Sequence, residues 1–188
     1  MADDAVGELI EEALVIVVGD GAERSDFESV FADKYRYTVL RGDTLSEIKV
    51  PDAVAAVDRF DAVIVVLEGA ECTLRGVERL FVDSLQIENM EEMVKMVVSV
   101  GSESVMDRGN EEEMKQPLNE LFGIIESNDV RFGQCFVDLL RGNGSNFSIL
   151  SLVQRLRKSV RGVTLHRFDP QLFLYQLAEN GDNDDDDE

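Results

Sequence analysis

The sequence predicts an α/β fold, a three-layer sandwich whose central sheet is mainly parallel. Continuous apolar runs with β-branched residues occur at 13–18 and 62–67, and a mostly apolar run occurs at 94–100, as expected of strands buried on both faces of a parallel sheet. Segments whose apolar residues have helical spacing follow these runs. Because strands alternate with helices along the chain, a parallel sheet with helices on its faces is the expected architecture.

The first half of the chain supplies three predicted strands and two predicted helices. Ser25 precedes an acidic first turn and is the expected N-cap of the first helix. A second helix is expected from the apolar spacing that starts at Leu74. The strands, in order, are ALVIVV at 13–18, an edge strand at 35–40 and AVIVVL at 62–67.

The second half continues the alternation. After the strand at 94–100, helical spacing predicts a helix over 110–127, and QCFVD at 134–138 reads as a fourth core strand. Ser145 or Asn146 is the expected cap of the next helix, and Pro170 is placed to start a final helical segment. The apolar stripe of the helix before it is Ile149, Leu152, Val153, Leu156 and Val160.

Length and charge limit the classes of protein to which the chain can belong. A chain of 188 residues is expected to form one domain, here 13–178, between an acidic N-terminal lead at 1–12 and a disordered acidic tail at 179–188. The net charge of −21 opposes direct binding to nucleic acid, whose phosphates would be repelled. No apolar run reaches the length of a membrane span, and no signal pattern precedes the domain, so a soluble intracellular protein is expected.

The turn after the first strand has the position of a phosphate-binding loop. Its sequence, from Gly19 to Ser25, lacks the second glycine and the lysine of the working motif. Asp20, Glu23 and Asp26 surround the expected helix start and would repel a polyphosphate. A dinucleotide fingerprint is also incomplete, and the guanine-reading and magnesium motifs are missing from their expected places. We therefore expect no bound nucleotide and no cofactor.

Catalytic and metal sites find little support. His166 is the single histidine, and Cys72 and Cys135 have no basic residue as an expected partner, so both cysteines read as buried free thiols. No paired-cysteine spacing suggests a metal site, and no lysine completes a receiver-domain site. The expectation is a protein without enzymatic activity, without catalytic residues and without a metal.

One basic segment stands out in this acidic chain. QRLRKSVRG at 154–162 carries Arg155, Arg157, Lys158 and Arg161 with no acidic residue between them. A solvated helix face, or pairing with the surplus carboxylates, would account for these charges. The alternative is a docking surface for an acidic partner, for which these four residues are the candidate contacts.

The order of these segments resembles the centromere protein M family. The segments that carry the resemblance are LVIVVGDGAERSD, FDAVIVVL, KMVVSVGSES, GQCFVDLL, LVQRLRKSVRGV and FDPQLFLYQL. The resemblance implies a Ras-like small-GTPase fold with a shortened switch region and without nucleotide machinery. The acidic tail departs from the family pattern.

That resemblance also implies a function. It suggests a pseudo-GTPase scaffold of the inner kinetochore, in the nucleus, that supports chromosome segregation through contacts with centromere protein I in a complex with centromere proteins H and K. The alternative is a nucleotide-binding switch of the immunity-associated GTPase type with an atypical phosphate loop.

Overall fold

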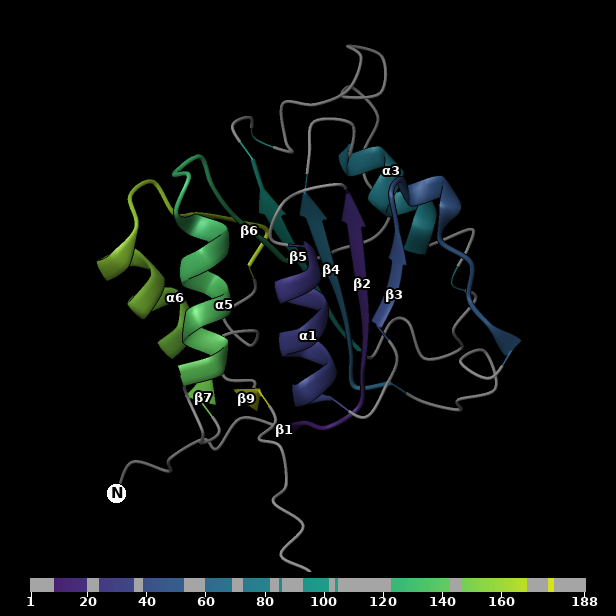
Figure 1. The fold of residues 1–188 in the computed structure, drawn as a ribbon, viewed down its shortest axis with the longest axis horizontal. Helices are drawn as coiled ribbons and strands as arrows, with labels where there is room; N and C mark the ends of the chain where they lie inside the picture. The colour runs from purple at the N-terminus through teal and green to yellow at the C-terminus, as the bar shows by residue number, and fades with distance from the viewer. Residues whose placement is uncertain are drawn as a thin grey trace, which may run out of the picture.

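The computed structural model describes residues 9–19, 24–35, 39–52, 60–68, 73–81, 85, 93–101, 104, 123–142, 147–168 and 176–177. Within these residues a six-stranded sheet has the order β3-β2-β4-β5-β6-β8 (Figure 1). Neighbouring strands are parallel except β6 and β8, which pair antiparallel. The predicted α/β fold with a mainly parallel sheet is therefore confirmed.

The central strands match the apolar runs of the sequence. β2 and β4 are buried along their whole length, as is all of β5 but its last residue, because helices or other chain segments cover both faces of the sheet. The strands of this sheet are β2 (Ala13–Gly19), β3 (Val39–Gly42), β4 (Ala62–Glu68), β5 (Val94–Val100), β6 (Gly123–Ser127) and β8 (Thr164–His166).

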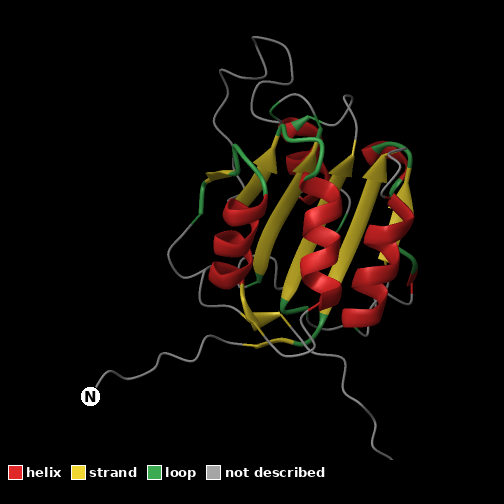
Figure 2. Ribbon diagram, turned by 60° about the vertical axis from the view of Figure 1, so that its left-hand side comes forward, coloured by secondary structure: helices red, strands yellow, loops and turns green. Residues whose placement is uncertain are grey.

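Helices lie on both faces of the sheet. Three of them, α1 (Arg24–Lys34), α5 (Phe132–Gly142) and α6 (Ile149–Ser159), lie side by side over one face (Figure 2). The short helix α3 (Leu74–Arg79) packs on the opposite face, and a single 3-10 turn, η1, spans Leu45–Glu47. Along β2, β4, β5 and β6, apolar side chains enter one or the other of two apolar clusters in alternation, which we call the α1-side and the α3-side core.

A second, smaller sheet lies at the amino-terminal ends of the main strands. It has the order β1-β9-β7, formed by β1 (Leu9–Ile10), β9 (Gln176–Leu177) and β7 (Phe147–Ser148). Leu177 is the register partner of Phe147, so the last described part of the chain lies against the residues that lead into α6. The sequence assigned Leu9 and Ile10 to an acidic lead, and it did not predict this sheet.

Several predicted elements differ from the structure. Residues 123–127, expected in a helix over 110–127, form β6, and the earlier part of that helix lies outside the described residues. QCFVD, expected as a strand, lies within α5. The cap of α6 is Ser148, whose Oγ accepts from the Ser151 backbone N–H at 3.1 Å. Ser25 lies inside α1, which begins at Arg24.

In the part of the chain that is described, the helices are all too short or too polar to cross a lipid bilayer.

Candidate functional site

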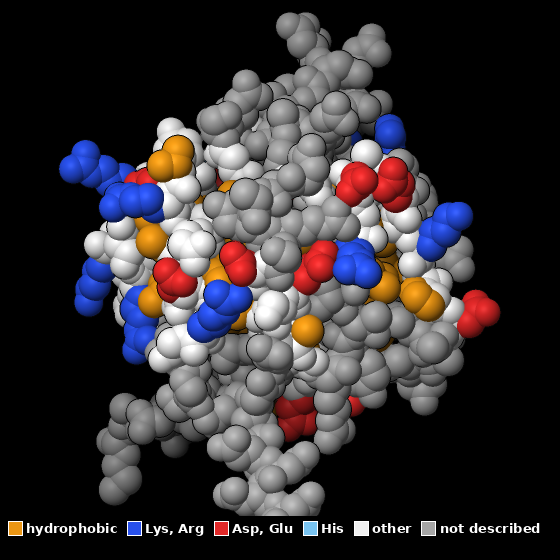
Figure 3. Space-filling model, viewed as in Figure 1, with side chains coloured by type: hydrophobic (Ala, Val, Ile, Leu, Met, Phe, Trp, Pro, Cys, Tyr) orange, Lys and Arg blue, Asp and Glu red, His pale blue; other side chains and the backbone are white. Residues whose placement is uncertain are grey.

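The outer side of α6 carries the basic residues singled out in the sequence. The predicted apolar stripe is confirmed, since Ile149, Leu152, Val153, Leu156 and Val160 are all buried in the α1-side core. Arg155, Arg157 and Lys158 are exposed on the helix, and Arg161 is exposed just beyond its end. We call these four residues the basic face. Lysine and arginine side chains gather on the side of the molecule where α5 and α6 lie (Figure 3).

The charge around the basic face is opposite in sign to that of the whole chain. Residues 123–168 hold seven arginines and lysines but only three carboxylates, in a protein of net charge −21. The three carboxylates already accept hydrogen bonds within this segment: Glu126 from His166, Asp129 from Arg131, and Asp138 from Gln134. Among the described residues, none forms an ion pair with Arg157 or Lys158. Their charge is available to an external anion.

An exposed apolar side chain lies near each end of the basic face. Leu150 is 41% exposed in the first turn of α6, and Val130 is 92% exposed in the loop between β6 and α5. The Val130 loop is tied to the end of α6, because the Arg161 backbone N–H donates to Asp129 Oδ2 at 3.2 Å. A protein ligand can use such apolar positions for burial while the arginines provide charge. Sequence reasoning singled out neither residue.

Asp129 fixes the loop on which Arg161 stands. Its carboxylate accepts from the Arg131 side chain at 2.9 Å and from the backbone N–H groups of Arg131 and Arg161. Ser127 Oγ donates to the Arg161 carbonyl at 2.7 Å, which adds a second tie between the two loops. The hydrogen bonds from Arg131, above all, hold the pKa of Asp129 well below its usual range. These contacts therefore fix the position of the Arg161 backbone at the carboxyl-terminal end of the basic face.

A second polar cluster lies between β5, β6 and β8. Glu126 is 7% exposed, and its Oε1 accepts from Ser104 Oγ and lies 2.7 Å from His166 Nε2. His166 opposes Ile124 in the antiparallel pairing of β6 with β8, so its ring reaches Glu126 diagonally on one face of the sheet. The carboxylate stands between the hydroxyl and the imidazole. The histidine therefore bonds to a carboxylate and is not seated as a base against Ser104.

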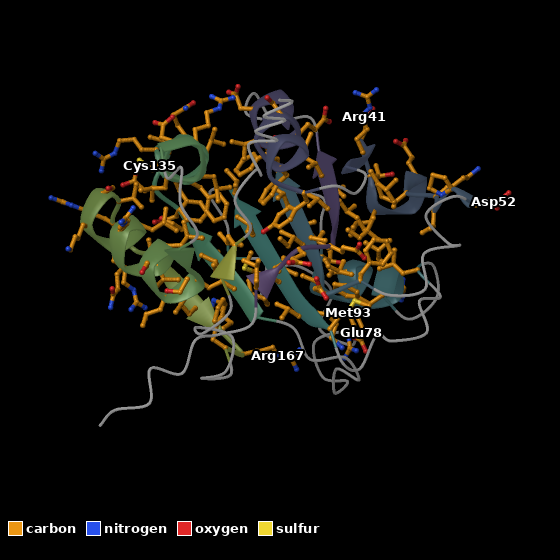
Figure 4. The ribbon with its side chains drawn as sticks, turned by 90° about the horizontal axis from the view of Figure 1, so that it is seen from below. Arg41, Asp52, Glu78, Met93, Cys135 and Arg167 are labelled. Carbon is orange, nitrogen blue, oxygen red and sulfur yellow. The ribbon has the colours of Figure 1, made fainter. Side chains whose placement is uncertain are left out.

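Cys135 does not form a catalytic pair with His166. Cys135 is half-buried in α5 and packs against the α1-side core, as does Leu165. Side chains alternate along a strand, so His166, next to Leu165, faces the α3 side together with Ile124. Figure 4 shows Cys135 on the α5 side of the sheet, with Glu78 of α3 on the opposite side. Cys72 lies outside the described residues.

At the end of β2, Gly19 lies against the backbone of Glu68 at the end of β4. Gly19 has a φ of +126°, and a Cβ at this position would lie 1.7 Å from the Glu68 carbonyl oxygen. The glycine is thus required by the close approach of two strands, whether or not a phosphate binds. Glu68 is buried beside it, and Asp26 in the first turn of α1 pairs with Arg141 at 3.2 Å. Asp20 and Glu23 lie outside the described residues.

A metal site is not apparent where the structure is described, since no three His, Cys, Asp or Glu residues converge there.

The fold defined by these elements is similar to that of a known protease proform. No protein-family model matches the chain, and no curated protein matches it. Among solved structures, the chain is similar to "structure of pro-sf-caspase-1", with a TM-score of 0.52 and 13% identity over 84% of this chain and 86% of that chain. At this identity the likeness shows the fold alone: a caspase-like α/β fold with a mainly parallel six-stranded sheet.

This comparison corrects the sequence interpretation. The expected relationship to the centromere protein M family is wrong, because the structural likeness is to a caspase proform and no family or curated match supports a kinetochore protein. The kinetochore scaffold function and its GTPase-switch alternative are wrong with it. The expected centromeric partners and nuclear location depended on that resemblance alone.

Proposed function

We propose that this chain is a non-catalytic domain with a caspase-like fold, a pseudo-protease, which binds protein partners through the basic face of α6. The finer assignment of the sheet, as caspase-like in place of a trimmed GTPase fold, is part of this proposal. The observation that carries the binding role is the exposed set Arg155, Arg157, Lys158 and Arg161 in a chain of net charge −21.

The residues of this chain support the non-catalytic half of the proposal. Caspase nucleophiles stand in a Q-A-C-[RQG]-G motif with the histidine about 50 residues upstream. This sequence has no such motif, its cysteines stand in ECT and QCF, and its histidine follows both. Cys135 and His166 also face opposite sides of the sheet. A thiolate–imidazole pair is therefore not assembled from them.

Electrostatics support a protein ligand with a local excess of negative charge. A cationic face attracts an acidic segment and speeds its encounter, while the rest of this acidic surface repels a uniformly acidic partner. The ligand class that fits is an acidic segment carried on an otherwise neutral or basic protein. Leu150 and Val130 offer this segment apolar contacts near the two ends of the basic face.

Charge reversal on two surfaces tests this proposal. The variant Arg157→Glu with Lys158→Glu changes the basic face, and Arg41→Glu with Lys49→Glu makes the same charge change at exposed positions elsewhere. Affinity purification from native cells, quantified by mass spectrometry, should lose its specific partners by at least tenfold in the first variant and keep them in the second.

Two results would overturn the proposal. Equal partner recovery with both folded variants would remove the basic face as the interface. Turnover of a peptide library by the wild-type protein, lost on Cys135→Ala or Cys72→Ala, would remove the non-catalytic assignment. Circular dichroism checks the fold of each variant, because acidic residues in the last turn of α6 oppose the helix dipole and cost about 0.3–1 kcal/mol each.

A further inference from the structure

The chain itself contains a segment with the chemistry that the basic face would bind. Six of the seven residues from Asp182 to Glu188 are acidic. This stretch follows β9, whose Leu177 lies in register with Phe147, two residues before α6 begins. Leu177, five residues before the acidic stretch, therefore lies beside the amino-terminal end of the helix that carries the basic face.

We propose that the acidic stretch 182–188 occupies the basic face of α6 within the same molecule and competes with partners for it. This inference rests on the proposed binding role of that face. The acidic stretch would act as an internal competitor, so that a partner needs a segment of higher charge or added apolar contacts to displace it.

Chain length permits this contact. An extended chain spans at most about 3.3–3.6 Å per residue, so the five residues from Leu177 to Asp182 reach about 17 Å, and Glu188 can lie about 37 Å away. An 11-residue helix such as α6 is about 16 Å long at 1.5 Å per residue. The acids can therefore reach every residue of the basic face, from Arg155 to Arg161.

Charge favours this segment over the other acidic end of the chain. Residues 1–8 contain three acids, Asp3, Asp4 and Glu8, spaced by apolar residues, whereas 184–188 is an uninterrupted acidic run. A run of adjacent carboxylates can reach several of these cations at once, and Arg155 and Lys158, three residues apart, are neighbours on the helix surface. The short tether also raises the local concentration of the acidic stretch to the millimolar range.

The direct test needs no partner. Backbone amide NMR spectra of the full-length wild type are compared with those of a variant in which Asp184, Asp185, Asp186 and Asp187 are changed to Asn. The matched control is Asp3→Asn, Asp4→Asn, Glu8→Gln and Glu11→Gln. We expect amide shift differences over residues 155–161 for the first variant only, which disappear when the ionic strength rises from about 0.02 M to 0.5 M because salt screens exposed charges.

Three results would overturn the inference. The first is an α6 spectrum unchanged by the Asp→Asn substitutions. The second is an equal change caused by the control variant, which would assign the contact to the N-terminal acids. The third is a shift difference that grows with protein concentration, since that would place the acidic stretch on a second copy of the chain.

A peptide titration separates this inference from the proposed function. The probe is the synthetic peptide GDNDDDDE, added to the wild type and to the Asp→Asn variant. With an effective concentration of about 1 mM and a peptide Kd near 0.1 mM, loss of the internal competitor should tighten apparent binding about tenfold. Equal, saturable binding to both proteins would overturn the internal competition alone. An absence of binding to both would overturn the proposed function as well.

Discussion

Cys135 and His166 lie on opposite sides of the six-stranded sheet. Cys135 packs into the α1-side core from α5, whereas His166 pairs through Nε2 with Glu126 on the α3 side, at 2.7 Å. A layer of buried strand backbone separates the two side chains. The arrangement explains how a caspase-like fold can be present without a thiol–imidazole pair built from these residues.

Slow alkylation of Cys135 is the first prediction. Cys135 is half-buried and lies on the side of the sheet opposite His166, so its thiol should react with iodoacetamide no faster than the same thiol in the unfolded chain. Mass spectrometry of the Cys135 peptide, in buffer and in concentrated urea at one pH, measures both rates. Faster labelling in the folded protein would contradict the assignment of Cys135 as a packing residue.

A second prediction concerns Gly19. The variant Gly19→Ala must place a Cβ against the Glu68 carbonyl oxygen at a backbone φ of +126°, so it should destabilise the protein by more than about 3 kcal/mol or prevent folding. The control is Gly142→Ala at the end of α5, where no atom lies within 4 Å of the added methyl group. Urea unfolding of this control should show a change within about 1 kcal/mol. Similar stability of the two variants would refute the strand-junction account of Gly19.

Replacing Tyr35 with phenylalanine is expected to be neutral or stabilising. Its ring stacks on Phe31 at 6.3 Å, but its buried hydroxyl has no hydrogen-bond partner among the described residues, and burial raises the pKa of the phenol. Tyr35→Phe keeps the ring and removes the buried polar group, so the free energy of unfolding should stay level or rise by about 1 kcal/mol. Tyr35→Leu loses the stacking, so its free energy of unfolding should be lower than that of wild type in the same urea titration. A decrease of more than about 1 kcal/mol in the free energy of unfolding of Tyr35→Phe would show that the hydroxyl is hydrogen-bonded.

Asp129 should make the protein sensitive to acid. Its folded-state pKa is depressed, above all by the Arg131 hydrogen bonds, so the carboxylate stabilises the fold at pH values above the unfolded pKa of about 3.9. This contribution is lost as the pH falls from about 4 through the folded value. Asp129→Asn should therefore be less stable than wild type at pH 7, and the difference should shrink below about pH 4.

The matched control for this prediction is Asp138→Asn, since Asp138 is exposed and bonds only to Gln134 Nε2 among the contacts described. Urea unfolding at pH 7, 5, 4 and 3 measures both variants against wild type. A stability difference for Asp129→Asn that stays constant over this pH range would contradict the stabilisation of the fold by the hydrogen bonds to the ionised Asp129 carboxylate.

The buried strands of the fold could be predicted because their sequences admit one interpretation. ALVIVV and AVIVVL are apolar on both faces, VKMVVSV is apolar on one face and at Val97 on the other, and their observed bounds differ from the predicted ones by at most one residue. The stripe of α6 was equally clear. β6 was predicted as part of a helix and part of α5 as a strand, because a short apolar run such as QCFVD fits both the helical and the strand period. Phe132, Phe136 and Leu140, at four-residue spacing, were the signal for a helix.

The candidate sites depended on more than local pattern. The four residues of the basic face were found from charge alone, since an acid-free basic stretch is conspicuous in this chain. The Ser104–Glu126–His166 cluster could not be found in this way, because it requires the antiparallel pairing of β6 with β8, forty residues apart in sequence. The contribution of Asp129 similarly depends on two loops meeting in space.

The most direct test is an NMR titration of the full-length protein, with four of the six acids of its acidic stretch removed by the Asp→Asn substitutions, against the peptide GDNDDDDE. We expect saturable amide shifts centred on Arg155, Arg157, Lys158 and Arg161. Arg157→Glu with Lys158→Glu should abolish them, Arg41→Glu with Lys49→Glu should leave them unchanged, and added salt should weaken them. Shifts centred elsewhere, or equal binding by both charge-reversal variants, would contradict the binding of an acidic segment by the basic face.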